Sequence, residues 1–269
     1  RVYTEHRHPF GYLEDSVADP ETFARRIGPQ DWLIWTGDGD YDWFESFLRR
    51  AQPSAQVAVR HCGSAFRGRA YDFNARDERL GVTCRIVSAD LLRLCTGPIR
   101  AFPHVGSSDD IQIEDPSPIA PGGKVRIVHC PSDRKTKGTA TILEALRMFD
   151  VEVVEKVSYP EAIRLRSGAH IFVGQAEPTI GALGLSTVEA MAQGQAIVSD
   201  ARYCEMAWAW IPKPPIAQVY TAEDIRREVK RLVEQPGLLD QRRHLSVRWA
   251  RENATPKKNA QYFLENLHP

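Results

Sequence analysis

Two stretches decide the fold: KVRIVHCPSDRKTKG, from Lys124 to Gly138, and IGALGLSTVEAMAQGQAIV, from Ile180 to Val198. The first begins with an apolar run, Val125–His129, which is typical of a short buried strand and leads through a polar loop into a helical pattern. The second enters a helical pattern, Ser186–Gln193, and ends in another apolar run, Ala196–Val198. Strands that alternate with helices in this way predict a parallel sheet covered by helices.

The same alternation extends in both directions from these stretches. In the second half, the other predicted strands are Val151–Val157 and His170–Val173, and the other helices are Thr139–Phe149, Pro160–Ser167, Ala222–Glu234, Leu238–Asn253 and Pro256–Leu267. In the first half, we predict strands at Asp31–Trp35, Gln56–Arg60, Val82–Val87 and Ile99–Phe102, helices at Pro20–Ile27, Tyr41–Ala51 and Ala89–Leu94, and a loop at Gly63–Gly68. Ligands of such sheets bind beyond the carboxyl ends of the strands, so functional residues are expected in the loops that follow strands.

A break in this pattern divides the chain. Residues 106–123, GSSDDIQIEDPSPIAPGG, are rich in proline, serine and glycine and show little periodicity, which is typical of a linker. We therefore predict one Rossmann-like domain over residues 1–105, a second over residues 124–254, and a closing helix over residues 255–269. Two α/β domains of βαβ units joined by a linker predict a cleft between them.

The composition excludes several classes of protein. Of the 269 residues, 42% are hydrophobic and 26% charged, which is too apolar for a disordered chain, and no run of about 18 apolar residues could span a membrane. Basic and acidic side chains number 35 each, so no basic surface that would follow a nucleic-acid backbone is indicated. Five scattered cysteines without a Cys-x-x-Cys pair indicate neither zinc nor a disulfide framework, and a cytoplasmic location is expected. The chain begins with Arg1 rather than Met, which suggests a trimmed N-terminus.

The polar loop of the first stretch carries three cations, Arg134, Lys135 and Lys137, between a strand and a helix. A helix start offers unpaired N–H groups and a partial positive charge, so converging cations there would make a site for an anion such as phosphate. A solvated surface turn is the alternative interpretation of this loop.

The glycine-rich turn of the second stretch is a similar junction. Gly181 and Gly184 permit close backbone approach or a positive φ. Ser186, which with Thr187 could cap the helix, lies three residues before Glu189 as in a capping box, so Glu189 either caps the helix or accepts hydrogen bonds from a ribose. Neither the Gly-x-x-x-x-Gly-Lys-Ser/Thr pattern nor a Gly-x-Gly-x-x-Gly after the first strand is present, so ATPases and NAD-dependent enzymes lack their motifs here.

Taken together, the two junctions resemble the donor-binding half of GT-B glycosyltransferases, in the retaining group called family four or group one. In that family a strand leads into a basic loop ending in Lys-Gly, as at Lys137-Gly138. About fifty residues later a glycine-rich turn precedes Glu-Ala-Met-Ala-x-Gly, as in residues 184–194. The resemblance covers residues 124–267 and implies two Rossmann-like domains facing a cleft, with the closing helix packed back on the first domain.

The first half resembles the family less. Residues 59–64, VRHCGS, are similar to a loop that reads His-x-Gly-Ser in some members, and by this resemblance His61 would contact the sugar or the acceptor from the opposite wall. A structural role for a lone histidine after a strand is the alternative. The first strand and glycine loop usual in the family are not evident, which implies a reduced acceptor domain.

One position departs from the family pattern. Many members carry two glutamates with seven residues between them, and the second corresponds to Glu189, whereas Gly181 stands where the first would be. The resemblance therefore does not imply the usual contact to the donor sugar at this position. Glu177 and Gln175 are candidates to replace it from the same loop.

The resemblance implies transfer of a sugar from a UDP- or GDP-linked donor to an acceptor hydroxyl, with retention of configuration. Departure of the diphosphate builds up negative charge, which fixed positive groups stabilise, so no metal or other cofactor is expected. Residues 38–40, Asp-Gly-Asp, are interpreted as a turn. The resemblance assigns catalytic roles to His61, Arg134 and Lys137, and donor binding to Gly184, the N–H groups of Leu185 and Ser186, and Glu189.

Other functions are compatible with parts of the sequence. A non-catalytic nucleotide-binding or partner subunit on the same scaffold would fit Gly181 and the small first domain. A sugar-nucleotide epimerase would need a set of carboxylates and histidines in the cleft, which the sequence does not provide. The balanced charge disfavours glucosylation of duplex DNA. The acceptor is open between a saccharide, a lipid-linked glycan and another hydroxyl compound, and peripheral membrane contact is compatible with the sequence.

Overall fold

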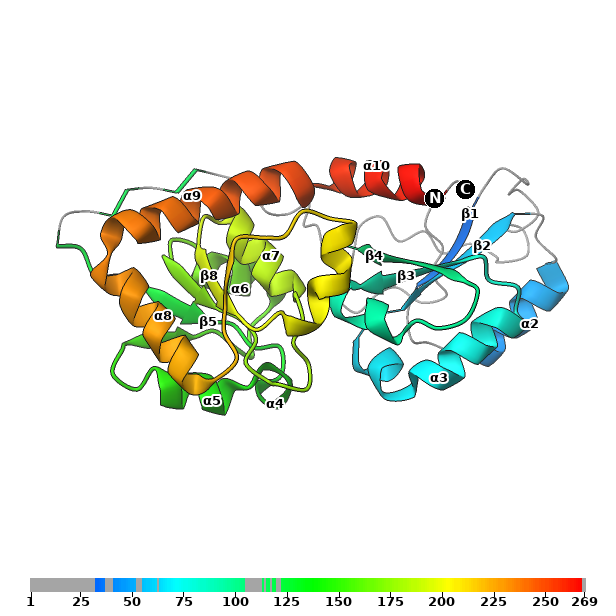
Figure 1. Cartoon of the computed structure of the whole chain (residues 1–269), viewed down its shortest axis with the longest axis horizontal. Helices are drawn as coiled ribbons and strands as arrows, with labels where there is room; N and C mark the ends of the chain where they lie inside the picture. Colours follow the sequence, from blue (N-terminus) through cyan, green and yellow to red (C-terminus); the bar gives the residue numbers. More distant parts are fainter. Residues whose placement is uncertain are drawn as a thin grey trace. The chain divides into compact units, whose positions relative to one another are not determined.

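The computed structural model describes residues 32–36, 41–51, 55–61, 63–104, 113, 115–116, 118–119 and 122–267. The chain divides into two compact units, each built on a parallel sheet (Figure 1). Unit 1 contains the residues up to Val87 together with Leu94–Phe102, and unit 2 contains Ser88–Arg93 and everything from Pro103 onward. The predicted helix Pro20–Ile27, the turn at residues 38–40 and most of the predicted linker lie outside the described residues.

Unit 1 carries a four-stranded sheet in the order β1-β2-β3-β4, in which β1, β2 and β3 run parallel. Its elements are β1 (Trp32–Thr36), α2 (Tyr41–Ala51), β2 (Gln56–His61), α3 (Gly63–Arg79), β3 (Cys84–Ser88) and β4 (Arg100–His104). The 3₁₀ helix η1 (Ala89–Leu94), which follows β3, belongs to unit 2 except for Leu94. The predicted strands and the helix Tyr41–Ala51 are confirmed, with strand ends shifted by at most two residues, and the predicted helix Ala89–Leu94 is the 3₁₀ helix η1.

The predicted loop at Gly63–Gly68 is wrong, because these residues begin the helix α3. The helix has a kink at Arg69, where φ is −138°. Phe66 and Phe73 are buried on either side of this kink and lie 5.7 Å apart between ring centroids. Burial of two aromatic rings against the sheet outweighs the low helix propensity of the glycines, which is a tertiary effect that local pattern does not report.

Unit 2 contains a five-stranded sheet in the order β6-β5-β7-β8-β9, and all its pairs are parallel. Its strands are β5 (Ile127–His129), β6 (Val151–Val153), β7 (Ile171–Val173), β8 (Ala196–Ser199) and β9 (Ile216–Gln218). The inner strands β5, β7 and β8 are buried along their whole length, which matches their continuous apolar sequence. The strand order reverses between β5 and β7, because β6 lies on the far side of β5. Ligands in this type of sheet bind at that switch point, outside the carboxyl ends of the strands.

Helices cover both faces of the unit 2 sheet. They are α4 (Arg134–Lys137), α5 (Thr139–Ala145), α6 (Tyr159–Arg166), α7 (Leu185–Ala192), α8 (Ala222–Glu234), α9 (Pro236–Asn253) and α10 (Pro256–Leu267), with the 3₁₀ helix η2 (Arg202–Ala209). Helix α7 packs against α9, and α5 packs against α8; Figure 1 shows α9 and α5 on opposite sides of the sheet. The predicted helices are confirmed, although the helix predicted at Thr139–Phe149 ends at Ala145. The strand predicted at Val151–Val157 ends at Val153, and α4, η2 and β9 are not among the predicted elements.

The closing helices agree closely with the sequence pattern. Helix α8 begins with a capping box, in which Thr221 Oγ1 accepts from the N–H of Asp224 and the Asp224 carboxylate accepts from the N–H of Thr221. Among the described residues no helix is long and apolar enough to cross a membrane. That α10 packs back on the first domain stays a prediction.

Candidate functional site

The loops after β5 and β7 lie at the switch point of the unit 2 sheet, and they hold the two junctions singled out in the sequence. The first loop folds into the four-residue helix α4, whose N-cap is Asp133 and whose C-cap is Gly138. Asp133 Oδ1 accepts from the N–H of Thr136 at 2.6 Å, so an acidic side chain already occupies the start of this helix. The predicted loop is therefore a capped turn of helix, and Lys137 is its last residue.

The first loop is fixed to the loop after β7 by three contacts. The N–H of Ala176 donates to the carbonyl of Lys137 at 3.1 Å, and Gln175 Nε2 donates to the carbonyl of Thr136 at 2.7 Å. At Gly138, where φ is +66°, a Cβ atom would lie 2.7 Å from the nitrogen of Glu177, so only glycine allows this approach. Gln175 is therefore a structural residue of this junction.

Lys137 and Gly184 meet. A Cβ atom built on Gly184 would lie 2.8 Å from Lys137 Nζ, so the ammonium group lies beside the glycine, where a side chain would otherwise be. Any larger residue at position 184 would displace the lysine. This contact confirms the prediction that the turns at residues 134–138 and 181–189 come together in space.

The start of α7 lies beside this ammonium group. The N-cap of α7 is Gly184, and no side chain caps this end of the helix. The predicted capping box between Ser186 and Glu189 is therefore wrong. The carbonyl of Gly184 accepts from the N–H of Thr187 at 2.9 Å. In the part of the chain that the structure describes, the N–H groups of Leu185 and Ser186 have no hydrogen-bond acceptor. Two unpaired N–H groups at a helix start, next to an ammonium group, form a site suited to an anion.

Arg134 does not join Lys137 at this site. Its guanidinium donates to both oxygens of Glu155, at 2.8 Å from Nε and 2.6 Å from Nη2. These bonds hold the pKa of the Glu155 carboxyl below its usual value. In this structure Arg134 forms an exposed ion pair with the loop after β6, and its role at a diphosphate stays a prediction.

Glu189 is a buried residue of α7. Its side chain is only 4% exposed, and its two oxygens accept from Arg166 Nη2 at 2.5 Å and from the Tyr159 hydroxyl at 2.8 Å. The sequence pattern indicates neither partner, because they lie 23 and 30 residues away along the chain. Tyr159 is 36% exposed and is the member of this group that solvent reaches. The contact of Glu189 with a ribose stays a prediction, and it would take place beside the tyrosine hydroxyl.

His129 links the end of β7 to the start of α5 through hydrogen bonds. Its Nδ1 lies 2.7 Å from the carbonyl of Val173, and its Nε2 lies 2.9 Å from Thr139 Oγ1. The carbonyl can only accept, so the neutral ring carries its proton on Nδ1 and Nε2 accepts from the hydroxyl. Burial lowers the pKa of His129 to about 4, and the charge of Lys137 acts in the same direction. The packing interpretation of His129 is therefore the correct one.

Gly181 occupies a tight turn in which a side chain has no room. Its φ is +48°, and a Cβ atom would lie 2.7 Å from Arg202 Cγ and 2.8 Å from Tyr203 Cδ2. A glutamate of the family pattern would collide with η2 at this position. The proposed substitute Glu177 accepts from the N–H and hydroxyl of Thr179, at 3.3 and 3.0 Å, and so stabilises its own turn.

His61 lies in the core of unit 1. Its ring has no exposed surface, stacks on Phe66 at 4.4 Å between centroids, and brings Nε2 to 2.9 Å from Asp77 Oδ2. The same carboxylate oxygen accepts from Arg85 Nε at 2.7 Å. The prediction that His61 contacts a sugar is corrected, because a ring enclosed by aromatic side chains and an ion pair is a structural residue.

Among the described residues, no group of three or more His, Cys, Asp or Glu side chains is placed to hold a metal ion. The four cysteines of the described part, Cys84, Cys95, Cys130 and Cys204, are free thiols.

No protein-family model matches the sequence, and no curated protein matches it significantly. Solved structures match its fold. An α-glucosyltransferase in complex with UDP-glucose and DNA containing an abasic site matches with a TM-score of 0.63 at 11% identity, over 96% of this chain and 86% of that protein. TarM matches with a TM-score of 0.60 at 13% identity, over 93% and 58%. The Glycosylation Associate Protein (Gap123) complex of Streptococcus agalactiae matches with 0.59 at 8% identity, over 91% and 56%.

The chain therefore spans little more than half the length of TarM and of the Gap123 chain. Similarity at such low identity establishes the fold and leaves the chemistry to the site itself. The chain has the GT-B fold, the architecture of the glycosyltransferases that it matches.

Proposed function

We propose that the protein is a glycosyltransferase that moves a sugar from a nucleoside-diphosphate sugar to an acceptor hydroxyl, with retention of configuration and without a metal. The observation that carries the proposal is the contact of Lys137 with Gly184 beside the two unpaired N–H groups of α7. This places a fixed ammonium group and a helix start at the switch point of the donor-side sheet, where a diphosphate would bind. The UDP-glucose in the matching α-glucosyltransferase favours a UDP-linked donor.

The chemistry of the transfer explains why these groups are needed. Breaking the bond between sugar and diphosphate leaves negative charge on the phosphate oxygens and oxocarbenium character on the sugar. Lys137 and the N–H groups of Leu185 and Ser186 would bind those oxygens more tightly as charge develops, and loss of one such donor typically lowers the rate by about 10²–10³. Because the protein itself supplies positive charge, a divalent cation is not needed for this step.

Titration calorimetry with UDP, GDP and ADP tests the proposed donor site. Lys137→Ala is expected to weaken UDP binding about ten- to hundredfold, because a hydrogen bond to a charged group contributes about 1.5–3 kcal/mol. Lys135→Ala is the matched control, since it removes an equal charge from an exposed position of the same helix. If the native protein and Lys137→Ala bind every nucleotide with equal affinity, the proposed donor site is wrong.

A non-catalytic partner subunit is the second candidate. The match to the Gap123 complex supports it, as does Gly181, whose crowded surroundings leave no room for a glutamate. The two functions separate in an assay of UDP release from UDP-glucose, with and without EDTA. Release that EDTA does not reduce and that Lys137→Ala slows supports the transferase; UDP-glucose binding without release, even with saccharide acceptors, supports the partner subunit.

A further inference from the structure

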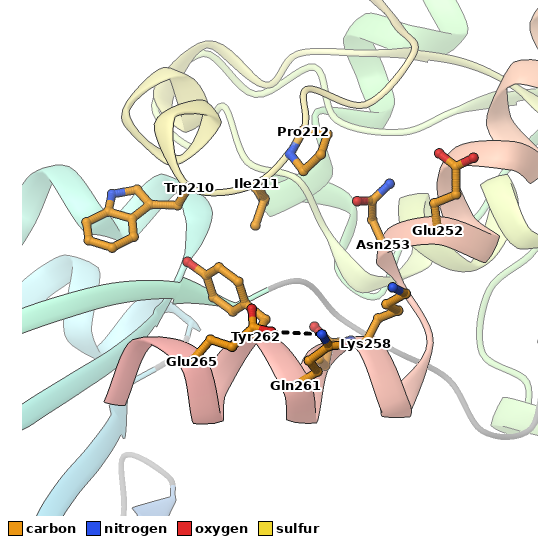
Figure 2. A pocket seen from close by; sticks show the side chains of 10 residues that line it. Trp210, Ile211, Pro212, Glu252, Asn253, Lys258, Gln261, Tyr262 and Glu265 are labelled. Atoms are coloured by element: carbon orange, nitrogen blue, oxygen red, sulfur yellow. Dashed lines mark hydrogen bonds between the residues drawn. The ribbon is translucent and has the colours of Figure 1, made fainter. Parts of the chain in front are cut away.

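Unit 2 contains a pocket formed by residues that take no part in the site at Lys137. It lies between the chain segment after η2, the end of α9 and the helix α10, and measures about 190 Å³ (Figure 2). Its walls consist of the side chains of Trp210, Ile211, Pro212, Glu252, Asn253, Lys258, Asn259, Gln261, Tyr262 and Glu265. A volume below the roughly 300–1,000 Å³ of pockets for drug-sized ligands suits a single small ring.

One wall is apolar and aromatic. Figure 2 shows the side chain of Tyr262 pointing from α10 toward Ile211. The indole of Trp210 belongs to the same segment as Ile211, the one that follows η2. Trp210 is 38% exposed, which is a large open surface for an indole ring. Such rings offer a flat face to apolar C–H groups and keep a polar edge for hydrogen bonds.

The other wall presents oriented amides. Asn253 Nδ2 donates to the carbonyl of Trp249 at 2.9 Å, and Asn259 Nδ2 donates to the carbonyl of Thr255 at 3.3 Å. These bonds anchor the nitrogens, and neither amide oxygen has a hydrogen-bond donor within the described ranges of the chain. Asn259 is only 9% exposed, so its free acceptor belongs to the pocket rather than to an open surface. Neither oxygen is among the fully buried polar atoms that lack a partner in the described part of the chain, so both are open to a hydrogen bond from a ligand that donates.

The charges in the wall have both signs. Lys258 is basic, whereas Glu252 and Glu265 are acidic, and Glu265 Oε1 accepts from Gln261 Nε2 at 2.8 Å. Two carboxylates repel a phosphate or an acidic sugar, and the ammonium group repels a cationic ligand. The wall therefore favours a neutral ligand rich in groups that both donate and accept.

We propose that this pocket binds one neutral sugar ring. Hydroxyl groups can donate to the oxygens of Asn253 and Asn259 and accept from Lys258, while the C–H face of the ring packs on Trp210 and Tyr262. A pocket of this kind would hold a non-reacting sugar of a saccharide at a place separate from the donor site. The proposal stands apart from the transfer reaction, because it concerns binding by other residues.

Saturation-transfer NMR on the full chain with glucose, N-acetylglucosamine and maltotriose tests the proposal. The native protein is expected to transfer magnetisation to at least one of these sugars, with millimolar affinity. Trp210→Ala and Asn253→Leu are expected to weaken that binding at least tenfold. Tyr220→Ala is the matched control, because Tyr220 is an aromatic residue of unit 2, 51% exposed, outside this pocket. Circular dichroism shows which variants remain folded, and if only one pocket variant is folded, that variant decides the outcome.

Four results would overturn the proposal. The native protein shows no transfer to any of the three sugars; the transfer persists in both folded pocket variants; or an excess of UDP abolishes it, which would place the sugar at the donor site. A choline probe that binds where the sugars do not would likewise replace the neutral sugar by a cation. Calorimetry with UDP on the same samples keeps a failure of this pocket distinct from a failure of the proposed transferase.

Discussion

At the scale of single residues, Glu189 illustrates how a motif residue gains partners that the motif does not contain. Its carboxylate is enclosed and bonded to Arg166 and Tyr159, so loss of its charge leaves a buried guanidinium without its counterion. We expect Glu189→Gln to lower the free energy of unfolding by about 3–5 kcal/mol, as measured by urea denaturation. Glu161→Gln, which loosens the exposed pair with Arg164, is the control and should change it by less than about 1 kcal/mol.

The same variant tests the ribose contact. If Glu189 accepts from the ribose, the native protein binds UDP more tightly than 2′,3′-dideoxy-UDP, and Glu189→Gln loses most of that difference. A native protein that does not distinguish the two nucleotides would limit Glu189 to its structural role.

His129 makes stability depend on pH. Its pKa in the folded protein is about 4, below the value of about 6.5 in an unfolded chain, so the unfolded state binds more protons between these values. The stabilisation is complete above about pH 6.5 and is lost as the pH falls toward 4, by at most about 3 kcal/mol from this residue. Urea denaturation at pH 7 and pH 5 should show a smaller loss for His129→Gln than for the native protein, and equal losses would contradict the assignment.

At the scale of elements, the turn before α7 explains the departure from the family pattern. Gly181→Glu combines an unfavourable positive φ with a collision against Arg202 and Tyr203, so we expect it to destabilise the protein by about 2–4 kcal/mol. Gly237→Glu is the control, since a Cβ atom at Gly237 meets nothing within 4 Å. Thermal melting compares the two. A Gly181→Glu protein as stable as the native one, with tighter UDP-glucose binding, would show that the turn can accept the glutamate.

The elements themselves were predicted unevenly, for reasons that their surroundings make clear. Helix α8 was predicted at its correct limits, because its cap and its apolar stripe lie within its own sequence. Helix α3 was missed at Gly63–Gly68, since the burial of Phe66 holds it in place. Strand β9 was missed because its three residues are only half-buried at the edge of the sheet.

At the scale of the whole molecule, the sequence by itself determined that two α/β units follow one another and that the loops at residues 134–138 and 181–189 belong together. Runs of apolar residues and helical spacing are local properties, and they set the element order and thus the ends of the strands. Tertiary structure alone decided which residues serve the site: it brought Lys137 onto Gly184, turned Arg134 to Glu155 and enclosed His61. The partner of a side chain is often a residue far away in sequence. No local sequence pattern specifies which distant residues the fold brings together in space.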